Sequence, residues 1–517
     1  MRKLCLFLIV SLALGADEKA AQRERARELL DSAAKMVASA QPQVQVAALL
    51  HLGENYNLVD HKKSIGFLEQ AFQSAADLPS SNQSDMRGPL QAEAVSIMAE
   101  VSLDKALEML PQLSLPPGQA HLDPRLRPVE KVVQLLLEKK DFSRAIEVVA
   151  GLGPTGDYPF RAAQLIFEKL PADDPQRVEV FSAATTAYAT RPNGPFPDLV
   201  SRHWQEVPRP IAEAALKALL NGILDRKDDS VMKSNISTAK GAVSFGSRQN
   251  RELFEILHVV RALDPKRADE LIESRAELKS AVERFPLGMR SMVSEESSDV
   301  SMSVMQGSKG GVEPRDEARE QLNAIARSRV AEAMSVLRQD PQKALSLVRG
   351  IPVPAMRAEV LGSVARSVSE KDPSTAKSVL DQTIQILDDI QNPAERVHVW
   401  DIVAEAAFRA KEPERAWQAV DRGLADAAAL YKKDADAEAP NEAPREYWPS
   451  TQSYRRIISR ATRLFGTEAE PLLVKITDPD LALLARIEMA QALLGRPYVP
   501  GPTNVSRSGK LQMNQER

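Results

Sequence analysis

Apolar residues recur along most of this chain at intervals of three and four positions, which is the spacing of one face of an α-helix. One stripe consists of Val360, Leu361, Val364 and Val368, and the next of Ala376, Val379 and Leu380. No segment of any length alternates apolar and polar residues as a half-buried strand would. The pattern therefore predicts an all-α protein with no β-sheet.

A short motif punctuates these stripes, with the form acid-Pro-x-x-Ala-x-x-apolar-apolar. It begins at Asp264, Asp340, Asp372 and Glu412, and looser relatives begin at Ser102 and Asp141. An acidic side chain suits the N-cap of a helix because it accepts a hydrogen bond from a free backbone N–H. Proline suits the first helical position, where its missing N–H is no loss. The alanine leaves room for a neighbouring helix to approach closely.

An apolar helical stripe stands upstream of each clear copy of the motif, so one unit reads as helix, short turn, helix. The units are about 32–40 residues long where copies are adjacent. A single helix pair cannot bury its apolar face, whereas a row of stacked pairs can. We therefore expect an α-solenoid of stacked antiparallel helical hairpins.

The hairpin around residue 400 resembles the tetratricopeptide repeat family. The likeness lies in Trp400, Val403, Ala404 and Ala407 on the first helix and in Ala416 and Val420 on the second. The chain departs from the family in its irregular period, and an aliphatic residue replaces the family's aromatic residue in helix two. The resemblance implies a superhelix with an extended concave face that binds a partner.

The stripes divide the chain into two helical regions. We expect repeats over residues 17–289 and 315–495, a flexible Ser/Gly/Met-rich linker or loop over 290–314, and a disordered tail over 496–517. Within the first region, residues 231–243 are expected to form a helix. A polar insertion begins at Lys432.

The N-terminus has the pattern of a secretory signal peptide. Arg2 and Lys3 precede an apolar run, Leu4 to Leu14, which is too short to span a bilayer, and small residues follow. Cleavage after Gly15 or Ala16 would remove residues 1–16. The alternative is a buried first helix.

Cys5, the only cysteine, lies in this segment, so the mature chain would have no disulfide, no thiolate metal site and no cysteine nucleophile. A long secreted protein of a eukaryote more often carries cysteine pairs. We therefore expect a periplasmic or secreted bacterial protein with no integral membrane segment after cleavage.

Composition and charge limit the classes of molecule that this protein is expected to bind. The chain has 517 residues, a formal net charge of −4 and 5% aromatic residues. Because no long basic run is present, nucleic acid is a poor candidate partner. A sugar-binding surface also usually needs more aromatic side chains.

Two motifs resemble a cofactor-binding fingerprint and a catalytic nucleophile motif, but their surroundings favour helical repeats. The stretch GLGPTG, Gly151 to Gly156, matches the dinucleotide fingerprint, yet the preceding apolar residues keep the helical phase and Pro154 would remove a phosphate-binding N–H. The stretch STAK occurs at 237–240 and 374–377, like the S-x-x-K nucleophile motif, but without the sheet and partner motifs that such enzymes need.

Histidines and paired acids give no clear site either. None of the six histidines has a metal-ligand spacing, and His258 and His398 fall in helical stripes, which indicates partly buried core residues. The acid pairs at 173–174, 228–229 and 388–389 are consecutive, and consecutive residues do not share a helix face. We nominate no catalytic, cofactor-binding or metal-binding residue, and we do not expect an enzyme or a cofactor.

The sequence therefore favours an exported scaffold that binds another protein or a peptide of unknown identity; its oligomeric state stays open. One alternative is an all-helical hydrolase or lyase that acts on an envelope polymer, which should show a cleft with opposed acids or a histidine with a perturbed pKa. Another is a purely structural envelope component.

Overall fold

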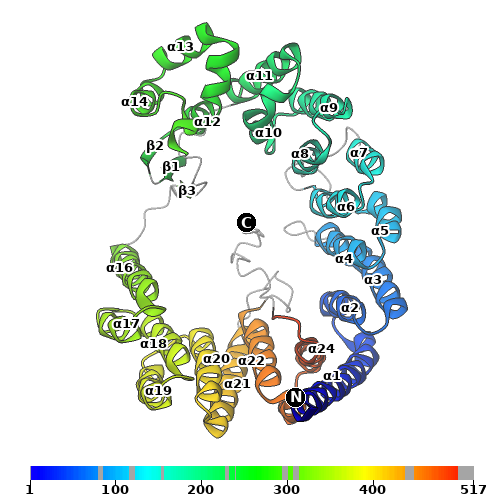
Figure 1. Ribbon diagram of the computed structural model, residues 1–517, viewed down its shortest axis with the longest axis vertical. Coiled ribbons are helices and arrows are strands. Elements are labelled where there is room, and N and C mark those ends of the chain that lie inside the picture. Colours follow the sequence, from blue (N-terminus) through cyan, green and yellow to red (C-terminus); the bar gives the residue numbers. More distant parts are fainter. Residues whose placement is uncertain are drawn as a thin grey trace. The chain divides into compact units, whose positions relative to one another are not determined.

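The computed structural model describes residues 2–79, 86–115, 123–152, 157–226, 232–238, 240–293, 301–306, 314–436 and 448–498. Helices form nearly all of its regular structure (Figure 1), so the prediction of a helical protein is confirmed at this level. The chain divides into two compact units. Unit 1 joins Met1–Val101 to Val312–Arg517, and unit 2 is Ser102–Gly311.

Unit 1 is built from both ends of the chain. Its N-terminal helices are α1 Arg2–Met36, η1 Val37–Ser39, α2 Pro42–Tyr56, α3 His61–Ala76 and α4 Arg87–Val101. Its C-terminal helices are α16 Pro314–Leu337, α17 Pro341–Val348, α18 Pro354–Val368, α19 Pro373–Leu387, α20 Pro393–Arg409, α21 Pro413–Asp436, α22 Pro449–Phe465, η5 Gly466–Ala469, α23 Pro471–Val474 and α24 Pro479–Leu493. Among the described residues, no helix is long and apolar enough to cross a lipid bilayer.

Neighbouring helices of unit 1 pack in a regular order. α18 packs against α19 and also against α20; α20 packs against α21 and α22; and α22 packs against α24. Each helix of the set α18, α20, α22 and α24 therefore lies beside the next member of the set. We call these four the first helices. α18 and α20 each precede the acid-Pro motif of their own pair, and α22 and α24 continue the same row.

The two chain ends meet within unit 1, where α24 packs against α1 and α2. Ala26, Leu30 and Ala33 of α1 are fully buried, and Arg25 of α1 forms an ion pair with Glu470. As a result every residue of α24 over Asp480–Leu493 is buried except Arg486. The N-terminal and C-terminal helices thus share one core.

Three copies of the acid-Pro motif cap helices as predicted. The side chains of Asp264, Asp340 and Asp372 accept hydrogen bonds from the backbone N–H three residues on, at 3.0, 2.9 and 3.0 Å. Asp141 makes the same contact at 3.4 Å, whereas the Ser102 side chain makes no capping bond. The motif alanines Ala106, Ala145, Ala268, Ala344, Ala376 and Ala416 are all fully buried.

Unit 2 contains shorter helices. They are α5 Leu103–Met109, η2 Leu110–Gln112, α6 Leu126–Glu138, α7 Phe142–Ala150, α8 Phe160–Lys169, α9 Gln176–Thr190, α10 Phe196–His203, η3 Trp204–Glu206, α11 Arg209–Leu224, α12 Arg248–Leu263, α13 Pro265–Glu273, α14 Ala276–Arg284 and α15 Met289–Met292. α12 packs against α10, α11, α13, α14 and α15, so it is the central helix of its part of unit 2.

Unit 2 also contains a small β-sheet, so the predictions of no β-sheet and of a helix over 231–243 are wrong. β1 Met232–Thr238 pairs antiparallel with β2 Gly241–Phe245 and with β3 Ser301–Gln306. Ile236 lies opposite Val243, and both are buried. The short apolar-polar alternation of β2 and the turn at Gly241, where φ is +140°, explain the hairpin.

The predicted linker and tail are only partly described. Within 290–314 the chain forms the end of α15, the strand β3 and the first residue of α16. The predicted boundary near 290–314 contains the end of unit 2 at Gly311, but the start of unit 2 at Ser102 was not predicted. Of the tail, residues 496–498 are described and lie against α22, as detailed below. The rest of the tail, like most of the polar insertion after Lys432, lies outside the described residues.

Candidate functional site

Polar side chains line up across three successive first helices of unit 1. Glu359 and Arg366 of α18 are seven residues apart, as are His398 and Glu405 of α20, and four residues separate Arg456 and Arg460 of α22. These spacings keep each pair on one face of its helix. We call these six residues the polar ladder.

The first row of the ladder joins Glu359, His398 and Arg456. The Arg456 guanidinium donates to His398 Nδ1 at 2.8 Å, and His398 Nε2 lies 3.5 Å from Glu359 Oε1. Because arginine can only donate, Nδ1 must accept and the ring proton lies on Nε2, toward Glu359. The contact with His398 holds the pKa of Glu359 below its usual value.

The second row joins Arg366, Glu405 and Arg460. Glu405 accepts from Arg366 at 3.2 Å and from Arg409 at 2.7 Å, and its Oε2 lies 2.9 Å from an Arg460 nitrogen. Arg460 also donates to Asp401 at 2.6 Å. Burial opposes ionisation of Glu405, but the charges of these arginines outweigh it and hold the pKa of Glu405 below its usual value.

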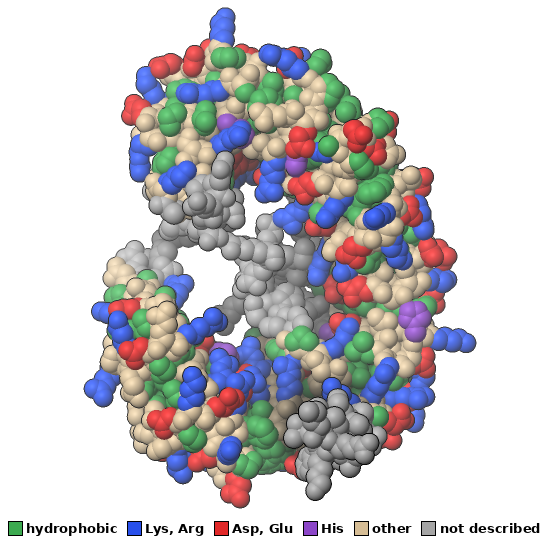
Figure 2. Space-filling view, in the orientation of Figure 1, with side chains coloured by type: hydrophobic (Ala, Val, Ile, Leu, Met, Phe, Trp, Pro, Cys, Tyr) green, Lys and Arg blue, Asp and Glu red, His purple; other side chains and the backbone are tan. Residues whose placement is uncertain are grey.

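The second row of the ladder is buried at Glu405, whereas the α18 side of both rows is open. Glu405 is 10% exposed, whereas the side chains of Glu359 and Arg366 are 47% and 40% exposed. Figure 2 shows Lys and Arg side chains gathered over α20 and α22. The ladder therefore fixes charges of both signs on adjacent helices, and its exposed groups can recognise charged or hydrogen-bonding groups of another molecule.

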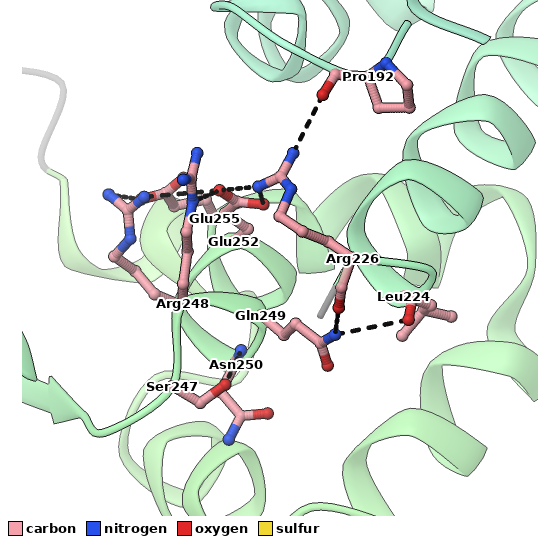
Figure 3. A network of polar contacts seen from close by, with 10 residues as sticks. Pro192, Leu224, Arg226, Ser247, Arg248, Gln249, Asn250, Glu252 and Glu255 are labelled. Atoms are coloured by element: carbon pink, nitrogen blue, oxygen red, sulfur yellow. Dashed lines mark hydrogen bonds and ion pairs between the residues drawn. The ribbon is translucent and has the colours of Figure 1, made fainter. Parts of the chain in front are cut away.

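A second polar cluster lies in unit 2 between α11 and α12 (Figure 3). Arg226, just after α11, donates to both carboxylate oxygens of Glu252 at 2.9 and 3.0 Å, and Arg248 donates to the same residue at 2.6 Å. Gln249 donates to the carbonyl of Arg226 at 2.6 Å, which binds the end of α11 to the start of α12. These contacts hold the two helices together.

Two carboxyl groups beside this cluster titrate abnormally. Burial raises the pKa of Glu255 to about 7, against the charge of Arg251, whose guanidinium lies 3.3 Å away. Burial also raises the pKa of Asp198 on α10. One turn along α12, burial lowers the pKa of His258, whose Nε2 lies 3.1 Å from the carbonyl of Ser201.

A cavity of about 370 Å³ adjoins Arg226. Its lining residues are Ala189, Pro192, Ala218, Asn221, Gly222, Asp225 and Arg226. Glu255 and His258 are not among them, so the groups with perturbed pKa values do not open into this cavity. Among the described residues, no group of three or more His, Cys, Asp and Glu side chains could hold a metal ion.

The motifs singled out in the sequence do not come together. Of GLGPTG, Gly151 and Leu152 form a turn after α7, and residues 153–156 lie outside the described part. Of the first STAK stretch, Ser237 and Thr238 end β1 and residue 239 lies outside the described part, while the second stretch lies in α19 with Ala376 fully buried. In the pair at 173–174, Asp174 accepts from the N–H of Gln176 at 2.9 Å, as expected for a cap.

The two histidines predicted in helical stripes differ in their surroundings. His258 is 8% exposed, as expected for a core residue, but His398 is 39% exposed and belongs to the ladder. The apolar stripes do not predict the ladder because its residues lie on the opposite side of each helix. The available signal was the recurrence of titratable residues seven positions apart on α18 and α20.

A comparison with protein-family models found no match to this chain, and a comparison with curated proteins found no significant match.

Proposed function

We propose that this chain is an exported α-solenoid, similar to tetratricopeptide repeat proteins, that binds another protein or a peptide along the polar ladder. The observation that carries the proposal is the ladder itself, which crosses α18, α20 and α22 and exposes charges of both signs. Charges fixed on successive helices favour binding specificity and a defined register of the partner.

The order of helix contacts supports the solenoid. The first helices lie next to one another, and α19 and α21 pack against them from their own pairs. Stacked helical repeats commonly bind partners along the surface formed by one helix of each pair. This step rests on analogy between folds.

Neutral variants of the ladder test the binding role. Glu359→Gln with Arg366→Gln removes two exposed charges of α18 while leaving Arg409 and Arg460 to pair with Glu405. A matched control is Arg267→Gln with Glu270→Gln on α13, a pair with similar exposure, 42% and 49%. Envelope extract is passed over immobilised wild-type and variant proteins. A protein retained by wild type and by the control but not by the ladder variant supports the proposal, and equal retention by all three contradicts it.

Export is the second part of the proposal. The positive residues, short apolar run and small residues at the N-terminus support cleavage after Gly15 or Ala16 and a periplasmic or secreted location, as in a bacterial envelope. N-terminal sequencing of the protein from the envelope fraction tests this directly. A protein that keeps residue 2 and stays in the cytoplasm would contradict export.

An envelope hydrolase or lyase is the second candidate. It is favoured by Glu255 and Asp198, two carboxyl groups on neighbouring helices whose pKa values burial raises. A carboxyl group that keeps its proton near pH 7 can act as a general acid. Release of soluble fragments from envelope polymers, abolished by Glu255→Gln, would favour the enzyme over the scaffold.

A further inference from the structure

The chain turns at Gly495, where φ is +75°, and the Arg496 N–H donates to the carbonyl of Gln491 at 3.1 Å, so that Arg496–Tyr498 lies against unit 1 directly after α24. Two side chains bind its backbone: Gln491 Nε2 donates to the carbonyl of Pro497 at 2.9 Å, and Arg463 donates to the carbonyl of Arg496 at 3.1 Å. Side chains that donate to backbone carbonyls can hold an extended peptide of many sequences.

The side chains of this segment bind separate helices. The Tyr498 hydroxyl lies 2.8 Å from Gln452 Oε1 and 3.1 Å from the Gln452 carbonyl. The guanidinium groups of Arg455 and Arg456 lie 6.0 and 5.9 Å from the centre of the tyrosine ring. The Arg496 guanidinium lies 2.9 Å from Glu54 Oε1 of α2. The segment therefore spans from α22 to α2.

The surface beneath the segment is polar. Glu488 and Gln491 of α24 are 1% and 5% exposed. Glu488 Oε2 accepts from Arg455 Nε at 3.1 Å, but within the described residues Glu488 Oε1 accepts no hydrogen bond. A buried carboxylate oxygen without a partner is costly in a permanent core. It suits a face that can bind a donor of another molecule.

This surface continues the polar ladder. Arg456, which donates to His398 in the first row, is also one of the two arginines whose guanidinium groups lie over Tyr498. α24 takes the next place after α22 among the first helices, and α2 packs against α24. The segment thus occupies the position where a partner following the ladder from α18 would arrive.

We propose that α22, α24 and α2 form a peptide-binding site, that Arg496–Tyr498 is its internal occupant, and that an extended partner segment with arginine and tyrosine two positions apart displaces it. The inference rests on the proposed binding function and names the chemistry of the partner. The tethered segment competes at a high effective concentration, so the free site would be reached only by a partner that binds better.

The test uses the full chain with Arg496→Ala and Tyr498→Ala, which weakens the internal occupant, beside wild type. The probe is a fluorescein-labelled peptide with the sequence of residues 494–503, LGRPYVPGPT, and its binding is measured by anisotropy. The control peptide carries alanine in place of the arginine and the tyrosine. We expect the double variant to bind the probe at least tenfold more tightly than wild type, and the control peptide at least tenfold more weakly.

Equal affinity of wild type and double variant, or equal affinity for the two peptides, would overturn the inference. If the double variant loses helical circular dichroism, the full chain with Tyr498→Phe replaces it, because only the hydroxyl contacts with Gln452 are lost. A threefold gain in probe affinity then supports the inference, and no change overturns it. Failure here with ladder-dependent capture intact would leave the proposed function standing, whereas loss of that capture with probe binding intact would contradict the proposed function.

Discussion

Two lysines hold a backbone conformation that favours glycine. Lys140 and Lys411 have φ values of 60° and 62°, and each directly precedes the acid of a motif copy. At Lys411 the helix ends with its N–H donating to the carbonyl of Phe408 at 3.0 Å and the N–H of Glu412 donating to the carbonyl of Ala407 at 2.9 Å. These bonds close α20 and start α21 within a single tight turn.

Lys411→Gly should therefore stabilise unit 1. Glycine adopts this conformation without the steric cost of a Cβ, so we expect the free energy of unfolding to rise by about 0.5–1 kcal/mol. Urea unfolding followed by circular dichroism measures the change. Lys411→Ala is the control, because it removes the same charged side chain but keeps the Cβ. If alanine stabilises as much as glycine, the left-handed conformation is not the cause.

Glu255 should make unit 2 less stable as the pH rises. Its pKa is about 7 in the folded protein, against a reference value of 4.5, because burial disfavours the charged form. The folded state keeps the proton up to about pH 7 while the unfolded chain releases it near pH 4.5, so stability falls between these values. A difference of this size corresponds to roughly 3 kcal/mol.

Glu255→Gln imitates the protonated form and tests this directly. Calorimetric melts at several pH values should show no difference from wild type below about pH 4.5, a growing advantage of the variant as the pH rises, and a constant advantage above about pH 7. Arg251 and Arg248 of α12 favour the charged form, while Glu252 of α12 and Asp198 of α10 oppose it. A constant difference at every pH would mean that packing, and not titration, separates the two proteins.

At the scale of the helix, close contacts between first helices depend on glycine. A Cβ added to Gly362 of α18 would lie 2.6 Å from Ile402 Cγ2 of α20, which is too close for two carbon atoms. We expect Gly362→Ala to force the helices apart and to lower the free energy of unfolding by about 1–3 kcal/mol. The measurement is again urea unfolding.

Two further variants separate this clash from a general effect of glycine. Gly66 lies in α3 with nothing within 4 Å of an added Cβ, so Gly66→Ala should be neutral or stabilising. Ile402→Ala should make Gly362→Ala less harmful in the double variant than the sum of the single changes. Additive effects would contradict a direct contact between the two positions.

The helices and their caps could be predicted from sequence because the information is local. The side chains of Asp340 and Asp372 cap helices, and the alanine four residues after each is fully buried. The motif predicts both the cap and the buried alanine. Asp478-Pro479 is a further copy of the acid-Pro pair and caps α24 in the same way, at 3.0 Å.

The β-sheet and the ladder could not be predicted because they depend on pairing between distant segments. β1 is completed by β3, and the two strands are more than sixty residues apart in the chain, with α12 to α15 between them. Likewise Arg460 meets Asp401 and Glu405 only after α20 and α22 are placed side by side. A stripe of charged residues on one helix does not reveal its partner.

At the scale of the whole molecule, the ends of the chain depend on each other. The residues of unit 2 stand in the sequence between the two halves of unit 1. α24 is nevertheless covered by α1 and α2, so the C-terminal half of unit 1 cannot bury its last helix by itself. An array of repeats normally needs a capping element where its apolar face would otherwise meet water, and here the N-terminal helices supply it.

Residues 312–517 expressed alone should therefore be unstable and aggregate, and residues 17–101 supplied in trans should restore a soluble complex. Leu30→Ala in the short fragment should weaken the complex, because burial of this fully enclosed side chain is worth about 2–5 kcal/mol. Lys35→Ala on the exposed side of α1 is the matched control. Size-exclusion chromatography and thermal melts of the mixed fragments measure the effect. A fragment 312–517 that is monomeric and as heat-stable without its partner as with it would show that α24 needs no cover, and α1 would then be an appendage of the fold instead of part of its core.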